Sequence, residues 1–162
     1  MVYASAMPDL LVKLYELPDY KPELERLAAE GVACRRAESF ERKRILEFIG
    51  QRWPHWRDEV EATFQRVPPT LLVAATASEL IGFAAYNATR PNYFGPTAVR
   101  SDQRKRGIGK LLLLLALDAL RSEGYAYAII GGAGPTAFYE RTVGAIVIPG
   151  SEGGIYGGKF LG

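Results

Sequence analysis

A chain of 162 residues, with 48% apolar and 23% charged residues, has the composition of one soluble globular domain. Its formal net charge of +2 is too small to make nucleic acid the main partner, so we expect none. Because Cys34 is the single cysteine, the chain can form neither an internal disulfide nor a cysteine-based metal site, and one histidine argues against a structural zinc.

The N-terminal stretch "MVYASAMPDL" lacks the basic start and apolar core of a signal peptide. The longest apolar run, residues 111–117, is too short to span a membrane. A lone cysteine also suits a reducing compartment. We therefore expect a cytoplasmic protein without a membrane partner.

The N-terminal part of the chain is predicted to form a strand, a short helix and a second strand. Residues 10–17 are predicted to form the first strand, with a helix as the alternative. Pro22 at a first helical position and Gly31 just past the end frame a helix over 23–30. Residues 32–38 form the next predicted strand.

Two further helices are predicted before the middle of the chain. Ser39 is a good N-cap for a helix that runs to about Gln51. Another helix begins at Pro54, and its apolar face is formed by residues spaced four apart, namely Trp56, Val60 and Phe64.

The middle of the chain has the pattern of β-strands. Residues 70–76 and 79–87 are apolar runs separated by a hairpin-length connection. Residues 94–100 form a third predicted strand, which is weakened at its start by Gly95 and Pro96.

The last third alternates helices and strands. A leucine-rich helix ends before Gly124, residues 125–132 form a buried strand, and 135–143 form a short helix. Residues 145–150 and 154–160 are predicted to close the chain as a hairpin. The order of elements predicts an α/β (α+β) fold with a mixed, mostly antiparallel central sheet flanked by helices.

The stretch "QRKRGIGKLLLLL", residues 103–115, places three cations and two glycines before the leucine helix. The first turn of a helix leaves N–H groups unpaired, and the helix dipole adds positive charge there. Glycines let a ligand approach this backbone, and arginine donates well to phosphate oxygens. The pattern predicts an anion site, and the alternative is a surface turn before a core helix.

Two familiar phosphate loops are absent from this stretch. A Walker loop needs glycine where Arg104 stands and Ser or Thr where Leu111 stands. A dinucleotide-binding fingerprint needs a third glycine where Leu112 stands.

The remaining pattern, Arg104-x-x-Gly107-x-Gly109 after a strand that ends near Val99, resembles the pyrophosphate loop of the GNAT superfamily of N-acetyltransferases. "GPTAFYERTVGA" is similar to the last helix of that family, although Ala145 replaces its usual aromatic residue. The resemblance implies one acetyltransferase domain over 1–162, with a GNAT-like core at 32–162 and an N-terminal extension at 1–31.

By this resemblance, acetyl-CoA is the co-substrate and no metal is needed. It would lie where the strand at 94–100 diverges from the strand at 125–132, with its thioester carbonyl near a backbone N–H that stabilises the oxyanion. An amine would attack directly, so Cys34 is interpreted as a strand residue. The cofactor-binding residues implied are Ala98, Val99, Arg104, Lys105, Arg106, Gly107, Ile108, Gly109, Lys110 and Phe138.

The resemblance makes Tyr139 the catalytic acid that protonates the leaving thiolate, and the alternative is packing beside Phe138. A base is harder to name, because an alkyl ammonium has a pKa of about 10 and the strand at 94–100 has no carboxylate. Candidates by residue type alone are Glu38, Glu47 and His55, and a water chain is the alternative.

Four residues are candidates for the acceptor site, with ordinary core packing as the alternative: Trp53, His55, Tyr93 and Phe94. We expect Trp56 to pack in the core. Leu114 shares a helical stripe with charged residues, which predicts partial exposure or a subunit contact, and a homodimer stays open.

The leading hypothesis is an N-acetyltransferase acting on a primary amine of a small molecule. The alternatives are a protein or peptide N-acetyltransferase and a non-catalytic acyl-CoA-binding regulatory module.

Overall fold

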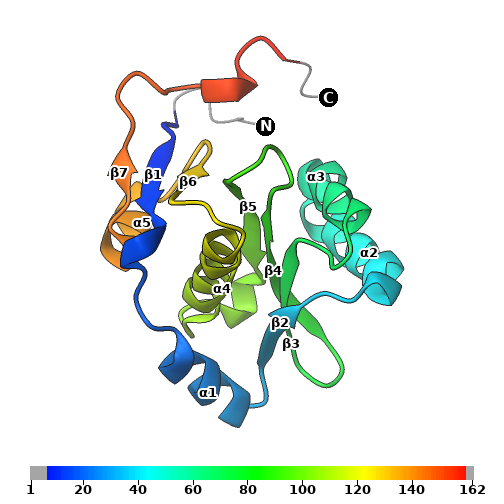
Figure 1. The fold of residues 1–162 in the computed structure, drawn as a ribbon. Coiled ribbons are helices and arrows are strands. Elements are labelled where there is room, and N and C mark those ends of the chain that lie inside the picture. The colour runs from blue at the N-terminus through cyan, green and yellow to red at the C-terminus, as the bar shows by residue number, and fades with distance from the viewer. Residues whose placement is uncertain (1–6, 160–162) are drawn as a thin grey trace.

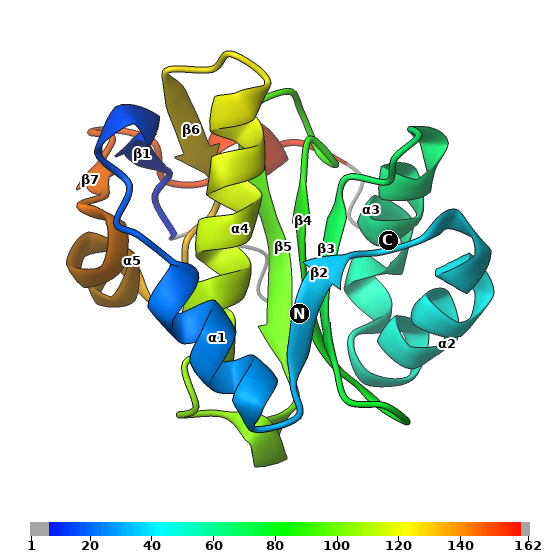
Figure 2. The same cartoon turned by 60° about the horizontal axis from the view of Figure 1, so that its bottom comes forward.

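The computed structural model describes residues 7–159, which form one seven-stranded sheet with helices on both faces (Figures 1 and 2). The strand order is β2-β3-β4-β5-β6-β1-β7. Neighbouring strands are antiparallel except β5 and β6, which are parallel. The predicted α/β fold with a mixed, mostly antiparallel sheet is confirmed.

The strands are β1 Leu10–Lys13, β2 Ala33–Arg36, β3 Leu71–Ala75, β4 Leu80–Tyr86, β5 Tyr93–Val99, β6 Tyr127–Ile130 and β7 Ile146–Val147. The α-helices of the described residues are α1 Lys21–Ala29, α2 Arg42–Arg52, α3 Arg57–Ala62, α4 Ile108–Ser122 and α5 Thr136–Val143.

The helix α2 is preceded by a 3-10 turn at Ser39–Glu41, and its cap differs from the expected one. Glu38, not Ser39, occupies the N-cap position, and its backbone N–H donates to the Glu41 carboxylate at 2.8 Å. The Glu38 side chain in turn accepts from the backbone N–H of Glu41, which completes a capping box. The predicted Ser39 cap is therefore wrong.

The N-terminal strand β1 lies inside the sheet, between β6 and β7. Leu10 pairs with Ile130 on one side and with Val147 on the other. The predicted C-terminal hairpin is wrong, because β7 pairs with β1. The chain after β7 forms a 3-10 turn at Gly154–Tyr156, and its last three residues lie outside the described part.

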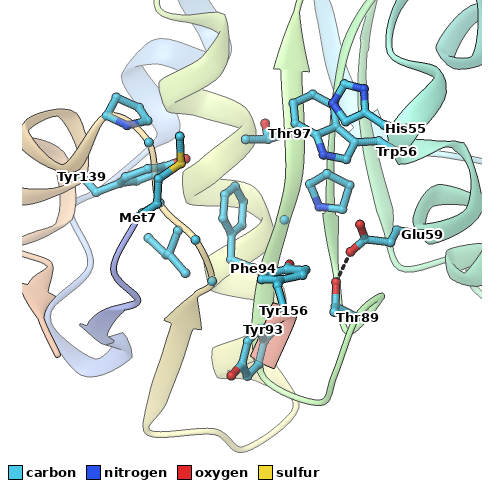
Figure 3. Close-up of a pocket in the computed structure, with 18 residues that line it drawn as sticks. Met7, His55, Trp56, Glu59, Thr89, Tyr93, Phe94, Thr97, Tyr139 and Tyr156 are labelled. Atoms are coloured by element: carbon cyan, nitrogen blue, oxygen red, sulfur yellow. Dashed lines mark hydrogen bonds between the residues drawn. The ribbon is translucent and has the colours of Figure 1, made fainter. Parts of the chain in front are cut away.

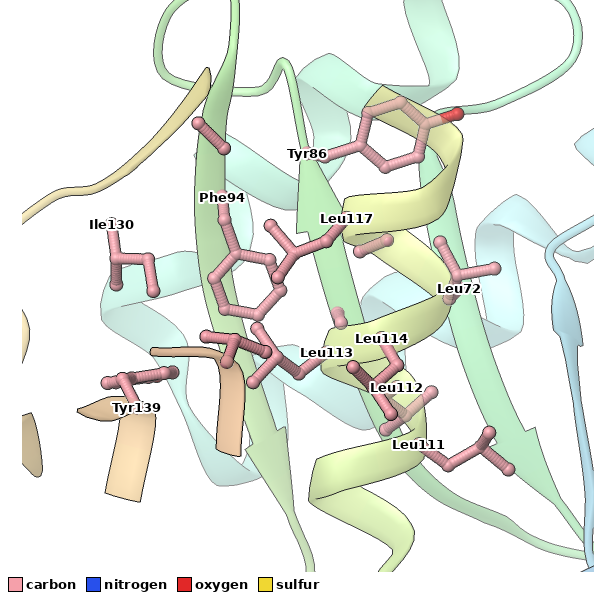
Figure 4. Packing of buried hydrophobic residues seen from close by; sticks show 14 of the residues in the cluster. Leu72, Tyr86, Phe94, Leu111, Leu112, Leu113, Leu114, Leu117, Ile130 and Tyr139 are labelled. Carbon is pink, nitrogen blue, oxygen red and sulfur yellow. The ribbon is translucent and has the colours of Figure 1, made fainter. Parts of the chain in front are cut away.

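The helix α4 packs its leucines against one face of the sheet, as Figure 4 shows for residues of β3, β4 and β5. Leu114 is 1% exposed, so its predicted exposure is wrong. The reason is that the N-terminal segment packs over the polar stripe of α4. Lys110 pairs with Glu23 of α1 at 2.9 Å, and the Tyr20 hydroxyl donates to Asp118 at 3.2 Å.

The helices α2 and α3 cover the opposite face (Figure 2). Ile45 and Ile49 of α2 and Val60 of α3 pack there with Val73 and Phe83 of the sheet. The predicted apolar face of the third helix, at Val60 and its helical neighbours, is therefore the face turned to the sheet. Among residues 7–159, no helix combines the length and apolar character needed to cross a membrane.

We expect Leu10→Ala to lower the free energy of unfolding by about 2–5 kcal/mol, because Leu10 is fully buried and its truncation leaves a cavity. Leu11, the next residue of β1, is only half-buried, so Leu11→Ala should cost less. Urea unfolding of both variants measures the difference. Equal, small losses would contradict the placement of β1 inside the sheet.

Candidate active site

The strands β5 and β6 pair at only two positions and then separate. The paired residues are Tyr93 with Ile129 and Phe94 with Ile130. The next two residues of β5 are unsuited to a parallel ladder, because Gly95 has a φ of +113° and Pro96 has no N–H to donate. A cavity of about 300 Å³ lies at this separation (Figure 3).

The open edge of β5 presents backbone groups to the separation. The Arg100 N–H donates to the Ile81 carbonyl of β4 at 2.9 Å. Since successive peptide groups of a strand point in opposite directions, the Val99 N–H and carbonyl point away from β4. Among the strands of residues 7–159, the Val99 N–H therefore has no pairing partner on the side where β6 has separated.

On the α5 side of the cavity lies Tyr139, which is 6% exposed (Figure 3). Its ring meets Phe94 edge-on at 6.3 Å and Phe138 at 5.2 Å, measured between centroids. Burial raises the pKa of the Tyr139 hydroxyl to about 12. Like any tyrosine with a pKa of about 10 or above, it is protonated at neutral pH and carries a proton that it can donate.

On the opposite side, α3 and the turn before it supply His55, Trp56 and Glu59 to the cavity (Figure 3). The Thr89 hydroxyl, in the loop between β4 and β5, donates to the Glu59 carboxylate. Sequence reasoning missed Glu59 and Thr89. The available signal was spacing, because Glu59 follows Trp56 by three residues and so shares its helical face.

The two terminal segments complete the cavity wall, with Met7 from one and Tyr156 from the other. Asp9 holds these segments in place. Its backbone N–H donates to the Ser151 hydroxyl at 2.8 Å, and its carboxylate accepts from the Gly132 N–H at 2.9 Å. Gly132 belongs to the glycine-rich loop 131–134, which forms the wall beyond β6.

The loop that precedes α4 has the properties of an anion site. Gly107 has a φ of +82° and caps the helix. The first backbone bond of α4 runs from the Leu111 N–H to the Gly107 carbonyl at 3.0 Å. The N–H groups of residues 108–110 therefore have no acceptor within the helix and point out of its positive end. Such an end fits a diphosphate.

Residues of α1 and of the turn after it contact this loop. Glu30 pairs with Arg106 at 3.0 Å, and Arg26 donates to the Arg106 carbonyl at 2.7 Å. Arg106 is the main reason that the pKa of Glu30 lies below its usual value. Within the part of the chain that the structure describes, the side chains of Arg104 and Lys105 pair with no acidic group. They are therefore the loop cations most available to a ligand.

The structure brings the predicted loop residues 104–110 together at the start of α4, directly after Ala98 and Val99 at the end of β5. Tyr93, Phe94, His55 and Tyr139 line the cavity. Two predicted cofactor-binding residues turn toward the core, because Ile108 is 1% exposed and Phe138 packs against the α4 cluster.

Other predicted residues lie away from the cavity. Trp53 packs against the rings of Phe48 and Phe83, at 5.7 and 5.6 Å between centroids. Glu38 and Glu47 are not among the residues that line the cavity, and Glu38 caps a helical turn. Trp56 contacts the Phe83 ring, as expected for packing, and also lines the cavity.

Cys34 is buried in β2, and this burial raises the pKa of its thiol to about 11. It is therefore a thiol, not a nucleophilic thiolate, at neutral pH. In the described range 7–159, no group of three or more His, Cys, Asp or Glu side chains is arranged to hold a metal ion.

The sequence model of the acetyltransferase (GNAT) family matches residues 35–145. The chain therefore belongs to the GNAT family of acetyltransferases, which confirms the resemblance seen in the sequence. Acetyltransferases of this family use acetyl-CoA as co-substrate. No curated protein matches the chain.

Solved structures of similar fold include GNAT enzymes. One is a GCN5-related glucosamine N-acetyltransferase region of a fungal multi-domain GH3 beta-N-acetylglucosaminidase, with a TM-score of 0.72, 17% identity and coverage of 88% of this chain and 20% of that chain. GCN5-related N-acetyltransferases from Sphaerobacter thermophilus and Kribbella flavida have TM-scores of 0.62 and 0.53, with 18% and 17% identity. This chain is covered to 88% in both comparisons and spans about half of each neighbour, 49% and 54%.

We expect the Tyr139 hydroxyl to remain protonated at about pH 11, where an exposed tyrosine with a pKa of about 10 is ionised. The measurement is a carbon NMR titration of the tyrosine rings, with the Tyr139 signal assigned by its loss in Tyr139→Phe. Ionisation of that signal near pH 10 would show that the hydroxyl is not buried as the structure has it.

Proposed function

We propose that the protein is an acetyl-CoA-dependent N-acetyltransferase that transfers the acetyl group to a primary amine of a small molecule by direct attack. The observation that carries the proposal is the separation of β5 and β6. It leaves the Val99 N–H unpaired, close along the chain to both the anion-binding loop and a cavity that contains Tyr139.

The residues present fit acetyl-CoA. The N–H groups of residues 108–110, together with Arg104 and Lys105, would hold its diphosphate. The unpaired edge of β5 offers backbone donors and acceptors to the amides of the pantetheine arm. When bound, the co-substrate supplies an acetyl group activated as a thioester.

Two groups of this chain would assist the transfer. The Val99 N–H would donate to the carbonyl oxygen and stabilise the negative charge that develops there. As the amine nitrogen bonds to the carbonyl carbon, the carbon–sulfur bond breaks and the sulfur takes the proton of Tyr139. The ammonium would lose one proton to water before attack and the amine a second as the amide forms, and Tyr139 would regain a proton from solvent.

The size of the cavity supports a small acceptor. A volume of about 300 Å³ lies at the lower end of the range of about 300–1,000 Å³ found for small-molecule sites. A site of this volume is small for an extended peptide. The position of Tyr139 on the wall of this cavity also favours catalysis over a purely regulatory acyl-CoA-binding module.

We expect Arg104→Ala combined with Gly109→Glu to abolish micromolar binding of acetyl-CoA, measured by isothermal titration. A carboxylate at the start of α4 competes with a diphosphate for the same N–H groups. A negative charge at the N-terminus of a helix interacts favourably with the helix dipole, so this variant should fold. Gly109 has room, because an added Cβ would meet only a Val99 methyl group at 3.8 Å.

The matched control is Lys43→Ala, which removes one exposed cation from α2 on the opposite face of the sheet. It should bind acetyl-CoA as the wild type does. Failure of the wild type to bind acetyl-CoA at all would overturn the proposed function.

We expect Tyr139→Phe to lower kcat by about 100-fold, because it removes the proton donor for the leaving sulfur. Its affinity for acetyl-CoA should be unchanged, since the hydroxyl is not needed to hold the diphosphate. Release of free thiol in the presence of an accepted amine measures the rate. An unchanged kcat would show that Tyr139 serves packing and does not donate the proton.

A further inference from the structure

The cavity beside β5 is largely apolar and carries one carboxylate. Its walls include several aromatic and apolar side chains, namely Met7, Trp56, Tyr93, Phe94 and Tyr156. Of the cavity-lining residues that the structure describes, Glu59 is the only acidic one, and none is Lys or Arg. Besides His55, Glu59 is therefore the one ionisable acid or base with which the described lining, tyrosines aside, can meet a ligand.

The Glu59 carboxylate accepts a hydrogen bond, and within residues 7–159 no Lys or Arg is paired with it. The Thr89 hydroxyl donates to its Oε2 atom from the loop between β4 and β5. No Lys or Arg side chain within residues 7–159 forms an ion pair with Glu59, whereas Glu61 on the same helix pairs with both Arg42 and Arg57. A half-buried carboxylate beside apolar walls gains most from a ligand that brings its own positive charge.

Glu59 borders the same cavity as Tyr139 and part of β5. Figure 3 shows Glu59 and Tyr139 on opposite sides of the cavity, with Phe94 between them. Thr97, two residues before Val99 on the same strand, lines the space as well. An amine that is attracted to Glu59 is thereby brought into the space that β5 and Tyr139 also border.

We propose that Glu59, positioned by Thr89, binds the ammonium group of the acceptor, and that the acceptor is a monoamine with an aromatic or apolar body. This inference rests on the proposed acetyltransferase function. The single carboxylate matches one positive charge, so a polyamine leaves its further charges unpaired. The aromatic walls match an apolar body better than they match an amino sugar.

The test uses 2-phenylethylamine as the probe and measures its binding by calorimetry in the presence of CoA. We expect the wild type to bind it and Glu59→Gln to bind it about tenfold or more weakly, since a charge-assisted hydrogen bond is lost. Thr89→Val should weaken binding in the same direction by a smaller factor, because the carboxylate remains but is no longer held.

The matched control is Asp58→Asn, which removes the same charge one residue earlier on the exposed side of α3, outside the cavity. Its affinity for 2-phenylethylamine should stay within about twofold of the wild type, as expected for a solvent-screened surface charge. All of the variants should bind acetyl-CoA as the wild type does, which separates an acceptor effect from misfolding.

Free-thiol release with 2-phenylethylamine, glucosamine and spermidine separates this inference from the proposed function. Preference for 2-phenylethylamine that is lost in Glu59→Gln supports both. Turnover of glucosamine or spermidine in preference, or equal amine affinity in the wild type and Glu59→Gln, overturns the inference and leaves the acetyltransferase intact. Glu59-dependent binding of 2-phenylethylamine without turnover of any amine supports the ammonium site and counts against the acetyltransferase.

Discussion

The strands β5 and β6 pair at two positions and then separate. Where parallel strands stop pairing, their backbone N–H and carbonyl groups need other hydrogen-bond partners. Gly95 and Pro96 stand at the point of separation, and neither favours a continuous ladder. The free edge that results is directed at the cavity, and the strand leads straight into the loop before α4. One interruption in the sheet thus accounts for three proposed features of the site. These are the binding of the co-substrate, the activation of its carbonyl and the space for the acceptor.

Much of this arrangement could be predicted from local sequence. The leucines of α4 and the cations and glycines before it are contiguous, so periodicity and loop chemistry identify them without tertiary information. Gly95 and Pro96 could likewise be recognised as weak points of a strand. Family resemblance points to Tyr139, and the structure adds its position on the cavity wall, where it is 6% exposed.

The features that sequence reasoning missed depend on contacts between distant segments. The insertion of β1 between β6 and β7 joins residues more than a hundred positions apart, which no local pattern encodes. Leu114 is buried because a segment 87 to 98 residues earlier pairs with its helix at Lys110 and Asp118. In the sequence, Glu59 has the pattern of an ordinary surface carboxylate of a helix. Its partner Thr89 lies thirty residues later, so no local pattern joins the two.

The N-terminal segment joins both ends of the site. Met7 lines the cavity, while Arg26 and Glu30 contact the loop that precedes α4. Arg26 also limits that loop sterically, because a Cβ on Gly107 would lie 2.9 Å from its guanidinium. Residues 7–31 are therefore part of the site's architecture as well as of the sheet.

The most direct test of this account is a titration of the isotope-labelled protein with acetyl-CoA, followed through its backbone amide signals. The account predicts that the Val99 N–H and the N–H groups of residues 108–110 shift together, because one ligand spans the open edge of β5 and the start of α4. The Ala98 and Arg100 N–H groups point to β4 and should move less. Shifts confined to another surface, with Val99 unmoved, would contradict the claim that the separated strand edge holds the co-substrate.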